Sequence, residues 1–406
     1  MKSILKQTSW LFLAQFLSRI IGFFYTIFLA KNLGVSDFGL YSASLAYFSL
    51  VSGVADFGFN RFLIREIARD RQKIPELICN IGIFRLTLGS LIFALFSIGL
   101  YLFDPDKLRV SLVLLAVVAV LPQAISLTLD AIFVALQKLQ YSSIALLILS
   151  LGTTTAGIWL ISTGFGVKGA VVALILGQLA YLLMLMLFIR IQGFKVLAKV
   201  TTHTIKQAIL GSLSYGLLGI LGLIYFRIDL LLLTYLRGNF DAGIYGAAYR
   251  FLEAIVFIPS ALATALFPIL AKLHDIDSSK IKSLYFNSIK VMGGLGLLIA
   301  LGYILILPPT IRLFLPNYAK SLEVVSILVL AIPFMFIHVP GAQVLLSTDR
   351  YLKKVIWLSV GILSFNLVLN LIFIPQYGVL AASWITVVSE VLTFMIFFQL
   401  LRAKIF

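Results

Sequence analysis

The sequence predicts an all-α polytopic membrane protein, with twelve transmembrane helices in two six-helix lobes related by a parallel repeat. Three observations lead to this fold class: the composition, the length of the uncharged runs, and a short motif that recurs about half a chain apart. Of the 406 residues, 61% are hydrophobic and only 12% are charged, against about 25% charged in an ordinary soluble domain. This chain has more apolar residues than a water-soluble core can bury.

Long runs without any charge indicate helices that cross a membrane. Residues 142–163, 169–189 and 355–374 contain no charged side chain. Each run is close to the roughly 20 residues of helix that span a bilayer core of about 30 Å. Lipid offers no hydrogen-bonding partner to the backbone, so these spans should be helices. The period-two alternation of a membrane β-barrel does not occur in the sequence.

The same criteria, applied along the chain, predict all twelve helices. We expect them near residues 8–30, 39–59, 78–103, 110–135, 142–163, 168–190, 207–235, 243–270, 285–307, 322–346, 352–374 and 378–401.

The net charge of +16 first suggests a nucleic-acid partner. However, Lys and Arg are in large excess on the side that carries both termini and every second loop. The positive-inside rule therefore predicts a protein of the cytoplasmic (inner) membrane with both termini in the cytoplasm. The same charges would attract anionic membrane lipid. No aromatic stacking platform lies beside a basic groove, so we expect no nucleic-acid binding.

A short motif, D-x-G-x-Y-x-A, occurs twice, beginning at Asp37 and at Asp241. Each copy stands at the start of a predicted helix. We interpret the glycine as allowing a tight turn, the aspartate as capping the next helix, and the tyrosine as an anchor at the membrane interface.

Other features recur at nearly the same offset and in the same order. They include Gly166 with Gly378, and Pro122 with Pro333. Such spacing predicts a duplicated six-helix unit, with lobes at 1–195 and 196–406. An even number of helices gives both copies the same orientation, so an axis along the membrane normal should relate them, with a site between the lobes near the midplane. The paired prolines predict matching kinks.

Two segments carry a family resemblance. Residues 33–69, "LGVSDFGLYSASLAYFSLVSGVADFGFNRFLIREIAR", and residues 376–390, "QYGVLAASWITVVSE", resemble bacterial polysaccharide-biosynthesis membrane proteins. These are O-antigen-flippase-like oligosaccharide flippases of the multidrug/oligosaccharidyl-lipid/polysaccharide exporter superfamily. The resemblance implies a central cavity and a flippase that moves undecaprenyl-pyrophosphate-linked oligosaccharide from the inner to the outer leaflet by alternating access. A multidrug/toxin extrusion antiporter of the same superfamily is the alternative, and a polysaccharide polymerase is a possible partner.

Charged side chains inside predicted spans are candidate site residues, because such charges usually face an interior or a water-filled cavity. We predict that Arg19, Arg85, Arg227 and Arg250 bind the pyrophosphate head group, since arginine holds phosphate oxygens in a bidentate fork. For Arg19 the segment "SRIIGFF" also resembles the first helix of the lipid II flippase, whose arginine faces the cavity. The alternative is that each arginine is paired within the bundle, and Arg85 is close enough to the cytoplasmic surface to reach it.

Three acidic residues in the spans are predicted coupling groups or charge partners: Asp229, Glu253 and Glu390. Glu253 follows Arg250 by three residues and shares its helical face, whereas Arg227 and Asp229 point to different faces. Glu390 lies mid-span, where it could carry a coupling H⁺ or Na⁺ or pair with an arginine. The sequence leaves these roles open.

We expect no enzyme, cofactor or metal centre. Nucleotide-binding and metalloprotease motifs are absent, and the longest hydrophilic loop, about 18 residues near 60–77, is too short for a catalytic domain. Asp104 and Asp106 flank a proline and are typical of a turn. Cys79 is the one cysteine, and the three histidines, His203, His274 and His338, are scattered and without partners in the sequence.

Overall fold

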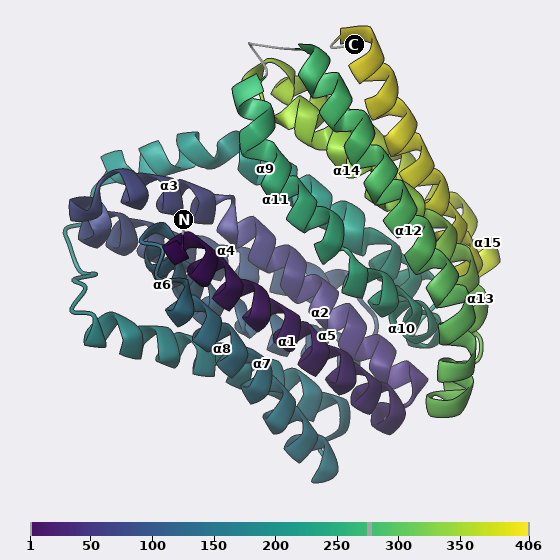
Figure 1. Ribbon diagram of the computed structural model, residues 1–406. Coiled ribbons are helices and arrows are strands. Elements are labelled where there is room, and N and C mark those ends of the chain that lie inside the picture. The colour runs from purple at the N-terminus through teal and green to yellow at the C-terminus, as the bar shows by residue number, and fades with distance from the viewer. Residues whose placement is uncertain (1, 274–277, 405–406) are drawn as a thin grey trace. The chain divides into compact units, whose positions relative to one another are not determined.

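The computed structural model describes residues 2–273 and 278–404, and within these ranges the protein consists of helices joined by turns and short connections, without strands (Figure 1). The all-α prediction is confirmed. The helices of the first half are α1 (Lys2–Leu33), α2 (Val35–Asp56), α3 (Phe59–Arg69), η1 (Arg71–Lys73), α4 (Ile74–Phe103), α5 (Lys107–Val118), α6 (Val120–Ala135), α7 (Leu139–Ser162) and α8 (Gly166–Ile191). Those that follow are α9 (Thr202–Leu236), α10 (Asn239–Ile255), α11 (Phe257–Leu273), α12 (Ser278–Phe314), η2 (Pro316–Tyr318), α13 (Ser321–Leu328), η3 (Val329–Ala331), α14 (Ile332–Leu346) and α15 (Asp349–Lys404).

Eleven segments within the described residues are long and apolar enough to cross a membrane, so the chain is a multi-pass membrane protein. The last of them belongs to α15, which has 56 residues and a break at Gly378 (φ 56°, ψ −130°). About 20 residues suffice for one crossing, so each side of the break is long enough to cross by itself. Twelve transmembrane helices are consistent with this arrangement.

The chain forms two compact units, residues 1–223 and 224–406, which divide within α9. The sequence repeat predicts a boundary between the two duplicated segments at residues 195/196. This boundary differs from the division between compact units, and it stays a prediction about the repeat. The start of α9 belongs to the first unit because its glycines pack against the segment around α3. A Cβ atom added to Gly216 would lie 2.3 Å from the Phe57 carbonyl oxygen, and one added to Gly211 would lie 2.7 Å from the Phe62 ring.

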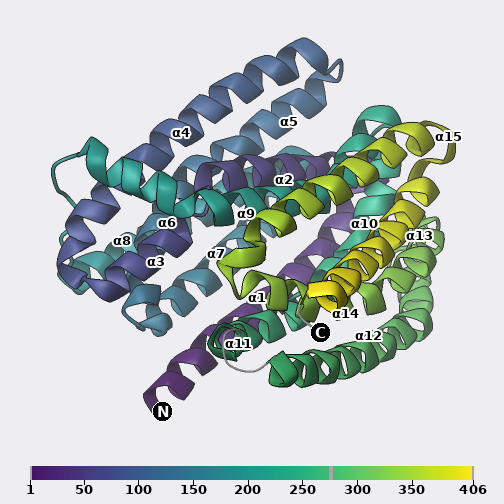
Figure 2. The same cartoon turned by 90° about the horizontal axis from the view of Figure 1, so that it is seen from above.

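Each unit is a bundle built around a few central helix pairs. In the first unit, α7 packs against α8 and α1, α2 packs against α5, and α4 packs against α6 (Figure 1). Its core contains Phe59, Ile132 and Phe133, which are fully buried. In the second unit, α14 is central and contacts α11, α12 and α15 (Figure 2).

The repeat recurs in the backbone as well as in the sequence. Gly34 (φ 76°) precedes α2, and Gly238 (φ 91°) precedes α10 at the corresponding place. Gly166 (φ 55°) begins α8, and Gly378 has nearly the same φ of 56° in α15. Residues with a side chain rarely adopt this left-handed region, so both units turn at matching positions for the same steric reason.

The interpretation of the D-x-G-x-Y motif was partly wrong. Asp37 and Asp241 lie in the first turn of α2 and α10, but the N-cap is the turn glycine three residues earlier, with no side-chain cap bond. The tyrosines Tyr41 and Tyr245 are 6% and 1% exposed, so they belong to the unit cores and are not interface anchors. The motif begins a helix whose second turn is packed inside the unit.

The paired prolines do interrupt matching helices, as predicted. The α5–α6 segment breaks at Ala119, shortly before Pro122. The α13–α14 segment passes through the short η3 turn immediately before Pro333. Proline cannot donate to the carbonyl four residues earlier, so each helix loses one backbone bond at its break.

The predicted loop near 60–77 is instead the amphipathic helix α3, followed by η1. Phe59, Phe62, Leu63 and Ile67 form its buried face. The high charge of this segment resides on its other face, which is why hydropathy alone suggested a loop.

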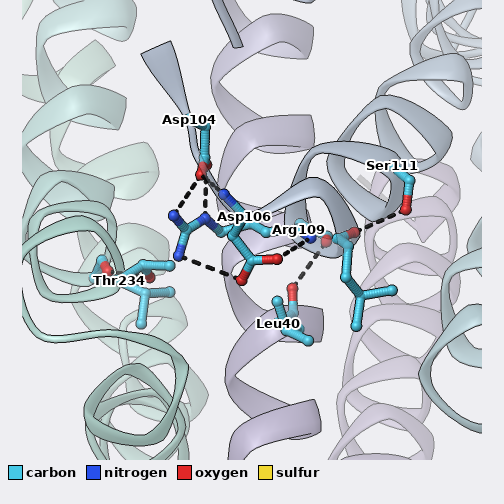
Figure 3. Close-up of polar contacts among 9 residues, drawn as sticks. Leu40, Asp104, Asp106, Arg109, Ser111 and Thr234 are labelled. Atoms are coloured by element: carbon cyan, nitrogen blue, oxygen red, sulfur yellow. Dashed lines mark hydrogen bonds and ion pairs between the residues drawn. The ribbon is translucent and has the colours of Figure 1, made fainter. Parts of the chain in front are cut away.

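The turn between α4 and α5 is the one predicted for Asp104 and Asp106. Figure 3 shows both carboxylates directed at the guanidinium of Arg109. Asp104 accepts from Arg109 Nε at 2.6 Å and from Nη2 at 2.5 Å, while Asp106 accepts from the Arg109 backbone N–H at 3.0 Å and caps α5. The two carboxylates therefore close a helix connection.

Candidate functional site

The second unit contains a cluster of three charged side chains, two arginines that share one carboxylate. Arg227 of α9 donates to Glu253 Oε1, and Arg250 donates to Glu253 Oε2 at 2.7 Å. The pairing of Arg250 with Glu253, which the sequence leaves open as the alternative to head-group binding, is present in the structure. Arg227 bonds this same carboxylate, and not Asp229 two residues along its own helix. Two guanidinium groups and one carboxylate leave a formal charge of +1.

This arginine–glutamate cluster is partly accessible. The side chains of Arg227, Arg250 and Glu253 are 19%, 25% and 18% exposed. The Nε atom of Arg227 is buried and has no hydrogen-bond partner among the described residues. A buried donor without an acceptor is costly, so the cluster retains unused capacity for an anion.

Asp229, one turn further along α9 from Tyr225, lies in a second polar cluster made of neutral groups. Its Oδ1 accepts from Asn370 at 2.7 Å. Its Oδ2 accepts from Thr386 at 2.8 Å and from Tyr245 at 3.1 Å. The carboxylate is 6% exposed, and no cationic side chain bonds it within the described residues.

Glu390 is the centre of a third group of polar contacts. Its Oε1 accepts from Tyr225 at 3.0 Å, and its Oε2 lies 2.9 Å from His338 Nδ1. The expectation that His338 stands alone was wrong, because α14 brings it to a carboxylate of α15. The sequence leaves two roles open for Glu390, which are cation coupling and pairing with an arginine. The contacts described here are with Tyr225 and His338, and neither is an arginine.

The Asp229 and Glu390 clusters are connected through α15. Asn370 donates to Asn366 at 2.9 Å, and Asn366 donates to Ser389 at 3.2 Å, next to Glu390. Sequence reasoning missed the asparagines and Thr386. A usable signal was present, because polar residues four apart share a helical face. The pairs that follow this spacing are Tyr225 with Asp229, Asn366 with Asn370, and Thr386 with Glu390.

The first unit holds Arg85, which is buried and paired. Its guanidinium donates to Asp56 and, at 2.8 Å, to Thr128 Oγ1, and it lies 5.8 Å from the Phe59 ring centroid. The side chain of Arg85 is 1% exposed, so the hypothesis that Arg85 reaches the cytoplasmic surface was wrong. Ser52 and Gln123 line a small pocket with this ion pair.

Arg19 lies on α1 and is exposed within the described residues. Neighbouring side chains on this helix, among them Phe16 and Phe24, are large, apolar and also exposed. Of the predicted residues, the structure thus brings Arg227, Arg250 and Glu253 into direct contact. Asp229 and Glu390 lie in adjoining clusters of the same unit.

Among the described residues, no group of three or more His, Cys, Asp or Glu side chains could hold a metal ion. His203 is exposed beside Gln207, and His274 lies outside the described residues. The buried oxygen atoms around Asp229 come mainly from amide and hydroxyl groups.

The bundle of apolar helices with buried polar clusters defines a multi-pass membrane protein. Residues 4–274 match the family model described as "Polysaccharide biosynthesis protein". The match covers well over half of the chain, so the chain belongs to this family. Residues 215–372 also match the family model MatE. The predicted family is confirmed.

Relatives and solved structures agree with this assignment. An uncharacterized membrane protein of Methanocaldococcus jannaschii is 25% identical over 420 residues, covering 94% of this chain and 80% of that protein. The probable flippase AglR of Haloferax volcanii is 25% identical over 175 residues, covering 41% of this chain and 36% of that protein.

Two solved structures show the same fold. The inward-facing conformation of a multidrug resistance MATE family transporter of the MOP superfamily has a TM-score of 0.75 at 16% identity, covering 94% of both chains. The lipid II flippase MurJ, in an inward closed conformation, has a TM-score of 0.74 at 16% identity, covering 96% of this chain and 87% of MurJ.

Proposed function

We propose that this protein is a flippase that moves lipid-linked oligosaccharide, carried on undecaprenyl pyrophosphate, from the inner to the outer leaflet of the cytoplasmic membrane by alternating access. Its termini face the cytoplasm, and it performs transport without a chemical step. Membership of the polysaccharide biosynthesis family supports this proposal, as does the similarity to the probable flippase AglR.

The observation that carries the proposal is the arginine–glutamate cluster. Arg227 and Arg250 share one carboxylate and remain partly accessible. A pyrophosphate is an anion with several oxygen acceptors, and guanidinium groups bind such oxygens in bidentate geometry. An anionic head group would take up the donor capacity that Glu253 leaves unused, including Arg227 Nε.

The multidrug alternative is less well supported by these contacts. An extruder of organic cations would favour accessible acidic and aromatic groups. Here the carboxylates of Asp229 and Glu390 are 6% and 3% exposed, whereas the more accessible charges of the second unit include the two arginines. Their positive charge would repel a cationic drug.

Transport is coupled to a cation at Asp229 in this proposal. A buried carboxylate surrounded only by neutral donors carries an uncompensated charge, which is costly in a membrane interior. Binding H⁺ or Na⁺ would neutralise it. The Oδ1 atom of Asn370 is also buried without a partner among the described residues, and it could add an oxygen ligand for Na⁺.

A reconstituted assay tests the proposal directly. Purified protein is placed in vesicles that contain a polyprenyl-pyrophosphate-linked oligosaccharide, and a membrane-impermeant glycosidase reports the fraction of glycan that has crossed. We expect wild-type protein to expose glycan of both leaflets, and Arg227→Gln to slow this by roughly ten-fold or more, as loss of one charge-assisted bond worth about 1.5–3 kcal/mol predicts.

Arg190→Gln is the matched control, because Arg190 is exposed at the end of α8 and makes no ion pair among the described residues. Vesicles in which wild-type protein leaves the inner-leaflet glycan protected, yet carries a fluorescent organic cation across, would assign the protein to the multidrug class instead.

A further inference from the structure

A pocket of about 310 Å³ opens in the first unit where three long helices begin or end. Its lining residues belong to the start of α4 and to the turns that follow α6 and α8; these helix ends are at the left of Figure 1. Its lining residues are Arg71, Gln72, Ile74, Pro75, Leu136, Lys138, Gly193, Phe194 and Lys195. Helix ends of a membrane bundle lie at the level of the lipid head groups, so this pocket meets the polar edge of the bilayer.

Three cations line this basic pocket, and no carboxylate does. Lys138 is held in place, since its Nζ donates to Gln192 Oε1 and lies 5.3 Å from the Phe194 ring centroid. Arg71 and Lys195 are exposed and make no ion pair with any described residue. Like charges that share one pocket repel each other, so an anion bound among them would stabilise the arrangement.

The backbone explains why these lysines are not needed as helix caps. Gln137 (φ 55°) and Gly193 (φ 67°) turn the chain at the ends of α6 and α8. The Lys138 N–H then donates to the Phe133 carbonyl at 2.8 Å, and the Phe194 N–H donates to the Ile189 carbonyl at 3.1 Å. These are the closing bonds of a Schellman turn. Because backbone groups satisfy these terminal carbonyls, the lysine ammonium groups are available to a ligand.

We propose that the basic pocket binds the phosphate group of an anionic phospholipid. Basic pockets between membrane helices recognise such head groups through their charge. The apolar lining favours a lipid over free phosphate, because Ile74, Leu136 and Phe194 would contact the glycerol and upper acyl carbons that inorganic phosphate lacks. This site is separate from the arginine–glutamate cluster and does not depend on the transported substrate.

The test uses the full-length protein purified in a neutral detergent. Phosphatidylglycerol or phosphatidylcholine is added at equal concentration, bound lipid is counted by native mass spectrometry, and the Tm is followed by intrinsic fluorescence. We expect phosphatidylglycerol to be retained and to raise the Tm, and phosphatidylcholine to do neither. In the double variant Arg71→Gln/Lys195→Gln, phosphatidylglycerol should bind roughly thirty-fold more weakly, on the basis of about 1 kcal/mol for each basic residue near an anionic lipid surface.

The control variant Lys73→Gln/Lys199→Gln removes the same charge from exposed lysines that do not line the pocket, and it should behave as wild type. Equal lipid retention by the two double variants would overturn the proposal. A second arm needs no variant: if inorganic phosphate alone raises the wild-type Tm as much as phosphatidylglycerol does, at matched ionic strength, the pocket binds free phosphate and the lipid assignment is wrong.

Discussion

Asp229 and Asn370 are joined by a 2.7 Å hydrogen bond, although 141 residues separate them in the sequence. The bond connects α9 to α15 and fixes one oxygen of a carboxylate that has no cationic side-chain partner among the described residues. We expect Asp229→Asn to keep the shape of this cluster and to remove its charge. The cation dependence of the Tm should then disappear.

The measurement for Asp229→Asn compares the Tm in sodium chloride with that in choline chloride, and repeats the comparison at lower pH. A cation that binds only the folded protein stabilises it by about 2.7 kcal/mol at roughly 100 times its Kd. Wild-type protein should gain stability from sodium or from acid, and the variant from neither. Asp241→Asn, which removes an exposed ion pair with Arg237, is the control. Equal responses in wild type and Asp229→Asn would remove Asp229 as the coupling group.

Glu253→Gln should destabilise the second unit, because it leaves two neighbouring guanidinium groups without their shared carboxylate. Loss of one partner from a buried ion pair costs about 3–5 kcal/mol, and partial exposure should reduce this to about 2–3 kcal/mol. The double variant Arg250→Gln/Glu253→Gln should recover part of the loss, since contacting residues are not additive. Thermal unfolding of the wild type, Arg250→Gln, Glu253→Gln and the double variant measures the coupling energy between the two side chains. If the losses of stability in the two single variants add up to the loss in the double variant, the two side chains do not interact, which would contradict the shared contact.

Arg85→Ala should destabilise the first unit by about 3–5 kcal/mol, because it leaves Asp56 without its ion-pair partner and Thr128 without its donor. Arg190→Ala, at an exposed position, should change stability by no more than about 0.5 kcal/mol. Both values come from thermal unfolding in the same detergent. Similar effects from the two variants would show that the buried pair contributes no more than a surface arginine.

Gly378→Ala and Gly166→Ala form a matched pair, because the two glycines have φ angles of 56° and 55°. Alanine is strained at a positive φ at either position, because its Cβ atom restricts the backbone where glycine does not. At Gly166 the new Cβ has nothing within 4 Å, whereas at Gly378 it lies 3.0 Å from Asp241 Oδ2 and 3.3 Å from Arg237 Nε. We expect Gly378→Ala to be the more destabilising in thermal unfolding. A reversed order would mean that the crowding at Gly378 relaxes at no cost.

Arg19→Ala tests the prediction that came from the family resemblance. In a cell whose own oligosaccharide flippase is deleted, we expect this variant to insert normally and to give no surface polysaccharide. Membrane fractionation measures insertion, and glycan staining measures output. Normal polysaccharide with Arg19→Ala would remove Arg19 from the site and leave the arginine–glutamate cluster as the candidate.

The fold was predictable because its causes are local. Long apolar runs specify membrane helices, and Pro122 and Pro333 mark breaks that follow from a missing backbone donor. The failures have equally local reasons. The charged face of the amphipathic helix α3 lowers its mean hydropathy, so hydropathy alone predicts a loop there. The tyrosines of the repeated motif are typical of a membrane interface in sequence, yet in the structure they are buried.

The polar clusters were only half predictable. Spacing within one helix identified the Arg250–Glu253 pair. The same spacing also predicts that Asn366 and Asn370 share a helical face, if uncharged polar residues are considered as well as charged ones. Contacts between helices, such as His338 with Glu390, depend on how α14 packs against α15, which no pattern within a single helix specifies.

The matching turns at Gly166 and Gly378 also bear on how such a protein could have originated. A segment that crosses the bilayer six times ends on the side from which it started. A tandem gene duplication would therefore have produced a second copy that inserted with the sidedness of the first. No ancestor with dual topology, and no reversal of the flanking charges, is needed to reach the present architecture.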